Sequence, residues 1–264
     1  MVFAFARHWI AGENLRDAIE RVRTDNKKKI NGMVNFLGEE TIDKEHVERI
    51  VKEYMEILDS IENLKSAISL KLTQLGLLLN KGHCLHNLSN ITKHAFDLKK
   101  FVWIDMEKSS FVNHTIEIYL HLSEDFPNIG LTVQASLRRS KKDLIKLLKK
   151  QAIIRLVKGA YHESKDVAFQ NKGEIDRNYV KLMEILFNKS ERFAIATHDE
   201  RLIEKAISFG METEFQFLMG IKENIKERLA KKYKVSEYIP YGTHWLPYVL
   251  RRIREHPTSL LKIL

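Results

Sequence analysis

Four side chains near the C-terminal end of the chain have the types and the spacing of a binding site for a small anion. Tyr248, Arg251, Arg252 and Glu255 recur at intervals of three and four residues, so in a helix they share one face. Two neighbouring guanidiniums, each a planar fork of donors, favour a carboxylate ligand. The other side of this helix is expected to have the apolar cover of Leu246, Val249, Leu250 and Ile253. The alternative for this helix alone is a solvated face of salt bridges.

Further polar side chains come at the ends of short apolar segments. They are Lys71, Asp105, Glu107, Gln134, Arg155, Lys158, Thr197, His198, Asp199, Gln216, Tyr238 and Tyr241. Lys71 stands inside an apolar run, where a lysine is costly unless a partner or ligand neutralises it. Asp199 is expected to cap a helix, and Arg155 to form a buried ion pair with Asp105. Together these residues supply cations, amides and phenols, which suit the binding of a cofactor and a small anion.

The segments that must position these residues alternate between strand and helix. Eight runs have the apolar character of buried parallel strands: 30–36, 67–72, 101–106, 129–134, 153–157, 193–197, 214–218 and 235–241. Segments with helical spacing lie between them, and 13–22 predicts an extra helix before the first strand. Eight repeats without a linker predict one (β/α)8 barrel domain over 1–264, with its site at the carboxyl ends of the strands. A doubly wound sheet is the rival, but no Gly-x-Gly-x-x-Gly follows any strand.

Composition restricts the function classes only in part. The net charge of +9 comes from 44 basic residues interleaved with 35 acidic ones, so it favours anionic ligands or solvated helices over nucleic acid. The single cysteine, Cys84, is expected to be an inert helical residue and suits a reducing cytoplasm. No run approaches the roughly 20 apolar residues of a membrane helix, so any membrane contact is expected to be peripheral, at the inner face. His83 and His86 lie beside Cys84, but no further ligands complete a metal site.

Six short segments, in order along most of the chain, resemble motifs of the flavin-dependent proline dehydrogenases. They are SLKLTQLG at 69–76, WIDME at 103–107, RLVKGAY at 155–161, ATHD at 196–199, EFQFL at 214–218 and YVLRR at 248–252. This resemblance implies a (β/α)8 barrel that binds FAD and oxidises L-proline to 1-pyrroline-5-carboxylate, with electrons passing on to a quinone. The chain lacks the helical arm that many relatives carry ahead of the barrel, which leaves open whether a partner subunit or a second copy replaces it.

The resemblance also implies roles for individual residues. The proline carboxylate would be held by Lys71, Arg251 and Arg252, and the rest of the substrate pocket would be formed by Tyr161, Leu218, Tyr238, Tyr248 and Ala160. The catalytic group would be Lys71, Asp105, Arg155 and Tyr238, with Asp105 orienting Lys71 and Arg155 stabilising negative charge on the flavin. The FAD contacts would be Met106, Gln134, Arg155, Lys158, Gly159, Ala160, Thr197, His198 and Glu255.

Two other functions remain as alternatives. A barrel lyase or isomerase acting on a carboxylated or phosphorylated metabolite would use Lys71 or Lys158 as an imine-forming amine. It leaves Tyr248 and the paired arginines unexplained, and it predicts a colourless protein. A nucleic-acid-binding protein ranks below both enzymes, because its support is the net charge alone.

Overall fold

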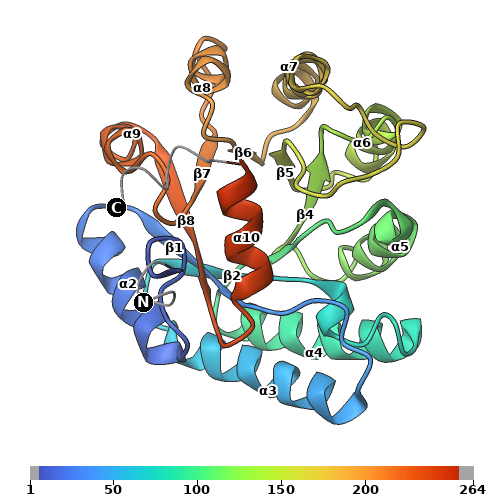
Figure 1. The fold of residues 1–264 in the computed structure, drawn as a ribbon, viewed down its shortest axis with the longest axis vertical. Coiled ribbons are helices and arrows are strands. Elements are labelled where there is room, and N and C mark those ends of the chain that lie inside the picture. Colours follow the sequence, from blue (N-terminus) through green and yellow to red (C-terminus); the bar gives the residue numbers. More distant parts are fainter. Residues whose placement is uncertain (1–5, 256–264) are drawn as a thin grey trace.

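A computed structural model describes residues 6–255 of the chain as a closed barrel of eight parallel strands (Figure 1). The strands follow one another around the barrel in chain order, and β8 pairs with β1 to close it. Their bounds are β1 Asn31–Phe36, β2 Ser66–Leu70, β3 Val102–Ile104, β4 Ile129–Gln134, β5 Ile154–Val157, β6 Phe193–Ala196, β7 Glu214–Leu218 and β8 Lys234–Tyr241. The predicted (β/α)8 barrel is therefore confirmed, although the outermost residues of the predicted 1–264 domain lie outside the described range.

Helices follow the strands because their apolar positions recur on one face and their first turns are capped. The bounds are α2 Leu15–Lys27, α3 Lys44–Ser60, α4 Lys81–Asp97, α5 Val112–Leu122, α6 Ser140–Leu148, α7 Lys172–Lys189, α8 Glu200–Ile207, α9 Glu223–Leu229 and α10 Leu246–Glu255. Asn14, Asp43, Asn80, Asn171 and Asp199 cap five of them through side-chain oxygens, as predicted for Asp199. Two short 3₁₀ helices, η1 Leu72–Gln74 and η2 Ser109–Phe111, complete the described elements.

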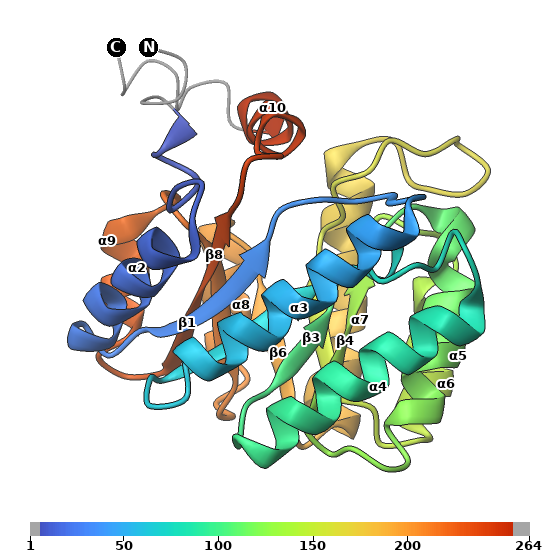
Figure 2. The same cartoon turned by 90° about the horizontal axis from the view of Figure 1, so that it is seen from below.

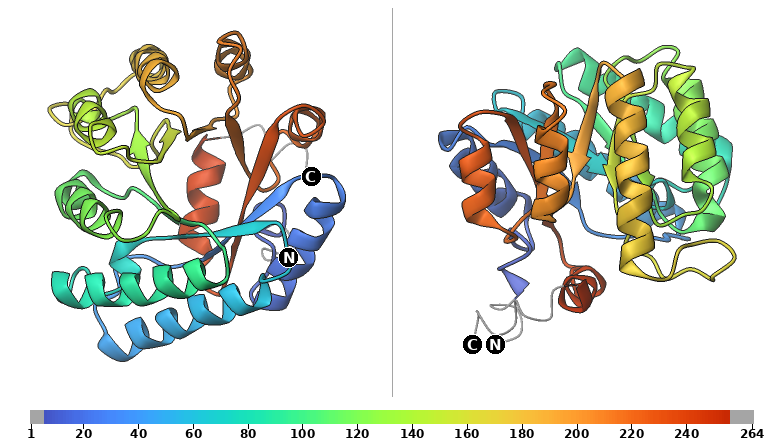
Figure 3. Two further views of the ribbon diagram at one scale, coloured as in Figure 1. Left: turned by 180° about the vertical axis from the view of Figure 1, so that it is seen from behind. Right: turned by 90° about the horizontal axis from the view of Figure 1, so that it is seen from above.

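The ring of helices around the barrel includes α2, whereas α10 is not part of the ring and lies over the centre of the barrel (Figures 1 and 3). The extra helix predicted at 13–22 is confirmed as α2, which extends to Lys27 and packs against β1 and β8. In contrast, α10 crosses the mouth of the barrel above the carboxyl ends of the strands (Figure 2). The last helix is thereby placed over the site that the fold builds at these ends.

The predicted apolar cover of α10 is wrong in part. Val249 is buried, but Leu246 is 51% exposed and Leu250 43% exposed. The reason is the position of the helix, since a helix that crosses the mouth has an outer face that meets solvent. Tyr248 and Arg252 lie on its buried side.

Two further sequence expectations concern single elements. The strand predicted at 67–72 ends at Leu70, so Lys71 follows β2 as the N-cap residue of η1 and does not lie inside the strand. Cys84 is buried in α4, and burial raises the pKa of its thiol to about 12, which confirms it as an unreactive helical residue. No helix among residues 6–255 is long and apolar enough to cross a membrane.

Candidate functional site

A cavity of about 1410 Å³ is lined by residues at the carboxyl ends of the strands and by residues of α10. Every residue predicted for the site lines it: Lys71, Asp105, Met106, Gln134, Arg155, Lys158, Gly159, Ala160, Tyr161, Thr197, His198, Leu218, Tyr238, Tyr248, Arg251, Arg252 and Glu255. Two of the other strand-end residues do not line it. Glu107 is buried against η1, and Tyr241 points outward, where its hydroxyl donates to Glu53 on α3 at 2.5 Å.

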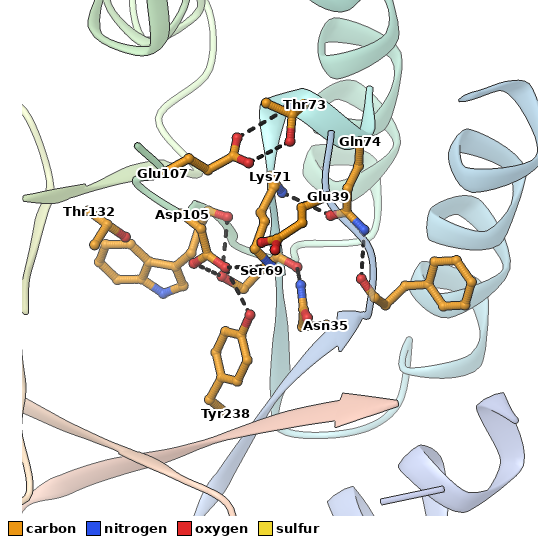
Figure 4. Close-up of polar contacts among 12 residues, drawn as sticks. Asn35, Glu39, Ser69, Lys71, Thr73, Gln74, Asp105, Glu107, Thr132 and Tyr238 are labelled. Carbon is orange, nitrogen blue, oxygen red and sulfur yellow. Dashed lines mark hydrogen bonds and ion pairs between the residues drawn. The ribbon is translucent and has the colours of Figure 1, made fainter. Parts of the chain in front are cut away.

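Asp105, directly after β3, is the centre of the polar network at the base of the cavity (Figure 4). Its Oδ1 accepts from the Ser69 hydroxyl at 2.8 Å, and its Oδ2 accepts from the Tyr238 hydroxyl at 2.8 Å. Packing around the phenol and the negative charge of Asp105 hold the pKa of Tyr238 well above its ordinary value. Tyr238 is therefore a neutral hydrogen-bond donor to Asp105 throughout the physiological pH range.

Arg155, on β5, forms the buried ion pair with Asp105 that the sequence predicted. Its Nε donates to Thr132 Oγ1 at 2.9 Å, and its Nη2 donates to Ser69 Oγ at 3.0 Å. The guanidinium also lies 5.1 Å from the centre of the Trp103 ring. These contacts fix a positive charge in the floor of the cavity in one orientation.

Lys71 projects into the cavity from the η1 turn, and its side chain is nearly buried. The Nζ lies 3.9 Å from Asp105 Oδ2, as expected if Asp105 orients it. The backbone N–H of Lys71 donates to Gln74 Oε1 at 3.1 Å, which fixes the turn that carries it. Glu107 holds the same turn, since its carboxylate accepts from the backbone N–H of Thr73 at 3.1 Å and from the Thr73 hydroxyl. The lysine expected to be costly thus has a carboxylate beside it.

Tyr248 and Arg252 of α10 line the cavity and carry buried donors. The Tyr248 hydroxyl and the Arg252 Nε have no hydrogen-bond partner among residues 6–255. Arg252 Nη2 donates to Glu255 at 2.7 Å, so one edge of its guanidinium is occupied. Burial raises the pKa of Tyr248 to about 12, so its phenol is a neutral donor. Buried donors without partners are rare in folded proteins and here indicate a ligand.

Arg251 is paired with Glu39, a residue that the site prediction omitted. Arg251 Nη1 donates to Glu39 Oε1 at 2.8 Å, and Tyr161 Oη donates to Glu39 Oε2 at 3.3 Å. Although burial opposes it, the bonds and the charge of Arg251 lower the pKa of Glu39, so it is ionised. The sequence offered little to mark Glu39 as a site residue, since it shows only a glutamate that follows Gly38 shortly after the predicted strand 30–36. Its partner lies 212 residues away.

On the other side of the cavity the residues predicted for the cofactor are already held by protein contacts. Lys158 Nζ lies 3.0 Å from Asp199 Oδ2 and also pairs with Asp176. His198 Nε2 accepts from the backbone N–H of Leu218 at 2.9 Å, which places the ring between the sixth and seventh strands. Gly159 has φ +109°, and a Cβ there would lie 2.1 Å from Ser136 Oγ, so only glycine fits this turn at the cavity edge.

Comparisons with known proteins agree with this geometry. The family model described as proline dehydrogenase matches residues 18–259. Proline dehydrogenase 1 of Bacillus subtilis is 33% identical over 269 residues, which cover 98% of this chain and 89% of that protein. The proline dehydrogenase of Deinococcus radiodurans is 31% identical over 269 residues, which cover 96% of this chain and 87% of that protein.

Solved structures of much longer proteins contain the same fold. Proline utilization A of Bdellovibrio bacteriovorus superposes with a TM-score of 0.89 at 24% identity, and that of Bradyrhizobium japonicum with 0.83 at 21% identity. The superposition on the Bdellovibrio protein covers 97% of this chain and 33% of that protein. The superposition on the Bradyrhizobium protein covers 95% of this chain and 30% of that protein. The fold, the site at the strand ends and the sequence matches lead to one conclusion: the chain belongs to the proline dehydrogenase family.

Proposed function

We propose that this protein oxidises L-proline to 1-pyrroline-5-carboxylate with bound FAD. The observation that carries the proposal is the pair of buried donors on α10, the Tyr248 hydroxyl and the Arg252 Nε, neither of which has a partner in the described chain. They line the same cavity as the cations of Lys71 and Arg251. A donor set of two guanidiniums, an ammonium and a phenol fits the carboxylate of an amino acid.

In this proposal the carboxylate of L-proline is bound by Lys71, Arg251 and Arg252. Three cations from two separate elements fix both the position and the orientation of the carboxylate. Orientation matters because the transfer of hydrogen from a ring carbon requires the reacting atoms to be held close and aligned. The ring of the substrate would then pack against the cavity residues Tyr161 and Leu218.

The polar network beneath the substrate would consist of Asp105, Tyr238 and Arg155, and it would keep the charged groups there paired. Asp105 balances the charges of Arg155 and Lys71, so neither cation is buried without a partner. Tyr238 stays protonated and donates to Asp105 Oδ2, the same oxygen that lies 3.9 Å from Lys71 Nζ. We assign these residues to catalysis because they form one bonded unit at the cavity floor.

The cavity has features that fit FAD. Its volume exceeds the roughly 300–1,000 Å³ of common small-ligand pockets, which leaves room for a dinucleotide and a substrate together. Gln216 Oε1 is also buried without a partner in the described residues and lines this space. FAD would contribute the two-electron acceptor for the hydride of proline. We assign its binding to Met106, Gln134, Arg155, Lys158, Gly159, Ala160, Thr197, His198 and Glu255.

We further propose a quinone as the onward electron acceptor, with the protein in the cytoplasm and at most peripherally bound at the inner face of the membrane. The resemblance to flavin-dependent proline dehydrogenases supports this acceptor. Reduction of a soluble quinone by proline, in the absence of oxygen, would test it. We also propose that residues 1–264 form one domain, because the barrel uses strands from residue 31 to residue 241 without a linker.

The visible spectrum of the purified protein tests the proposal as a whole. We expect added FAD to remain bound after gel filtration and its absorption band to bleach when L-proline is added without oxygen. A persistent band would refute proline as the substrate. Failure to retain FAD would refute the flavin chemistry and favour the lyase or isomerase hypothesis.

A further inference from the structure

The helix that carries the proposed substrate-binding residues has little support of its own. α10 lies across the barrel mouth and not in the ring of helices, and its outer residues Leu246 and Leu250 are exposed. Its buried side is made by Tyr248, Val249 and Arg252. Something other than packing in the helical ring must therefore fix α10 over the cavity.

That support comes from residues 6–13, which we call the N-terminal strap and which lie beside α10 (Figure 2). The backbone N–H of Ala11 donates to the Pro240 carbonyl at 2.9 Å, and the N–H of Gly242 donates to the Gly12 carbonyl at 3.0 Å. Beyond them, Trp245 Nε1 donates to Glu13 at 3.0 Å. The strap is thus bonded once to the end of β8 and twice to the connection between β8 and α10.

Trp9 is the large apolar side chain of the strap, and it is fully buried. It belongs to one packed cluster with Tyr248 and Val249 of α10, to which Leu218 and Tyr238 of the cavity wall also pack. This cluster is separate from the main core between the barrel and its helices. The cluster that contains Trp9 therefore joins the face of α10 to the wall of the proposed substrate pocket.

The strap is also held on its far side. Gly220, in the turn after β7, has φ +76°, and a Cβ on it would lie 1.9 Å from the carbonyl oxygen of His8. Only a glycine allows the two backbones to approach this closely. The strap is consequently fixed between the turn after β7 and α10, with Trp9 next to His8 in the narrow space between them.

We propose that Trp9 is a positioning residue for substrate binding: its indole holds α10 so that Tyr248, Arg251 and Arg252 converge on the substrate carboxylate. This inference rests on the proposed function and extends it to a residue far away in the sequence. Hydrogen bonds to a charged group weaken steeply when donor and acceptor are misaligned, so the packing that positions α10 is sufficient to control the affinity for a carboxylate. None of the residues assigned to FAD binding belongs to the Trp9 cluster, and Glu255 alone among them lies on α10.

The experiment compares Trp9→Ala and Trp9→Phe with the unaltered protein, and uses Phe187→Ala as the matched control. Phe187, on α7, is also a buried aromatic residue, but it packs on Phe193 of β6 and on Phe209 in the turn after α8. For each protein we would measure bound flavin, the thermal midpoint, kcat and KM for proline. Titration of the flavin spectrum with cyclopentanecarboxylate would report carboxylate binding without turnover.

We expect Trp9→Ala to raise KM and the cyclopentanecarboxylate dissociation constant by roughly 10-fold to 100-fold with flavin retained, and Trp9→Phe to raise them less. Phe187→Ala should lower the thermal midpoint without these increases. Unchanged constants in Trp9→Ala, or equal increases in Phe187→Ala, would overturn the inference. If Trp9→Ala does not fold, Trp9→Phe decides, and an unchanged KM in it overturns the inference. If proline does not reduce the bound flavin even in the unaltered protein, the proposed function is refuted instead.

Discussion

Replacing Arg252 by methionine tests the carboxylate anchor most directly. The Arg252 side chain is 7% exposed, donates to Glu255 through Nη2 and has an Nε without a partner in the described chain. Methionine keeps most of the length and the apolar packing of the arginine stem while it removes the charge and every donor. The change therefore isolates the interaction with the ligand better than alanine would.

The expected size of the effect follows from the type of interaction. A hydrogen bond to a charged group contributes about 1.5–3 kcal/mol, and loss of one partner from a buried charged pair costs about 2–5 kcal/mol. A loss of about 3 kcal/mol corresponds to roughly 100-fold in affinity. Since the carboxylate does not change during the oxidation, the loss should appear mainly in KM and leave kcat within a few-fold.

The assay is proline-dependent reduction of a dye, with bound flavin measured by its absorbance in the same preparation. Arg254→Met is the matched control, because Arg254 is exposed on the same helix and its loss changes the net charge equally. A KM in Arg252→Met that matches the control would refute the anchor. Loss of flavin with an unchanged KM would assign Arg252 to the cofactor.

Two further substitutions test carboxylates at the edge of the site. Glu39→Gln should lower the KM for proline about fivefold. The glutamine oxygen can still accept from Arg251 and keep it in position, while the negative charge that competes with the substrate carboxylate is removed. Kinetics against the nearby control Glu40→Gln check this, and an unchanged KM contradicts it. Burial raises the pKa of Glu107 from 4.5 to about 7, despite its bonds to Thr73, so from pH 4.5 to 7 the folded protein binds more protons than the unfolded chain. Stability should therefore fall by about 3 kcal/mol as the pH rises through this window and stay low above it. Glu107→Gln should remove that fall in urea unfolding at pH 5 and pH 8, and an equal fall in the variant would contradict the assignment.

The barrel could be predicted from sequence because its signal is local and repeated. Eight buried strands separated by amphipathic helices leave few topologies, and the predicted strand ends lie within two residues of those observed. The end of β2 was predicted two residues too late, because the spacing of apolar residues does not show where a turn begins. The backbone N–H of Lys71 donates to the side-chain oxygen of Gln74, and this bond stabilises the η1 turn. The turn begins here although Leu72 continues the apolar pattern.

The candidate site could be predicted as a set of residues but not as a set of contacts. Spacing placed Tyr248, Arg251 and Arg252 on one helical face, and all three line the cavity. Periodicity does not reveal which face of α10 meets solvent, because this depends on where the helix crosses the barrel. Glu39 could not be assigned a role, since an isolated carboxylate in a loop is usually solvated and its partner lies 212 residues away.

The ion pairs around the cavity explain how three cations can lie close together before a ligand binds. Lys71 has Asp105 beside it, Arg251 has Glu39, and Arg252 has Glu255. Each pair reduces the cost of burying a cation, and together the three carboxylates allow the cations to lie around one cavity despite their mutual repulsion. A substrate carboxylate then adds to charges already in position, so little of its binding energy is needed to order them. The donors without a partner in the described chain, on Tyr248 and Arg252, would then determine which anions bind, because an anion that cannot accept from them leaves them buried and unpaired.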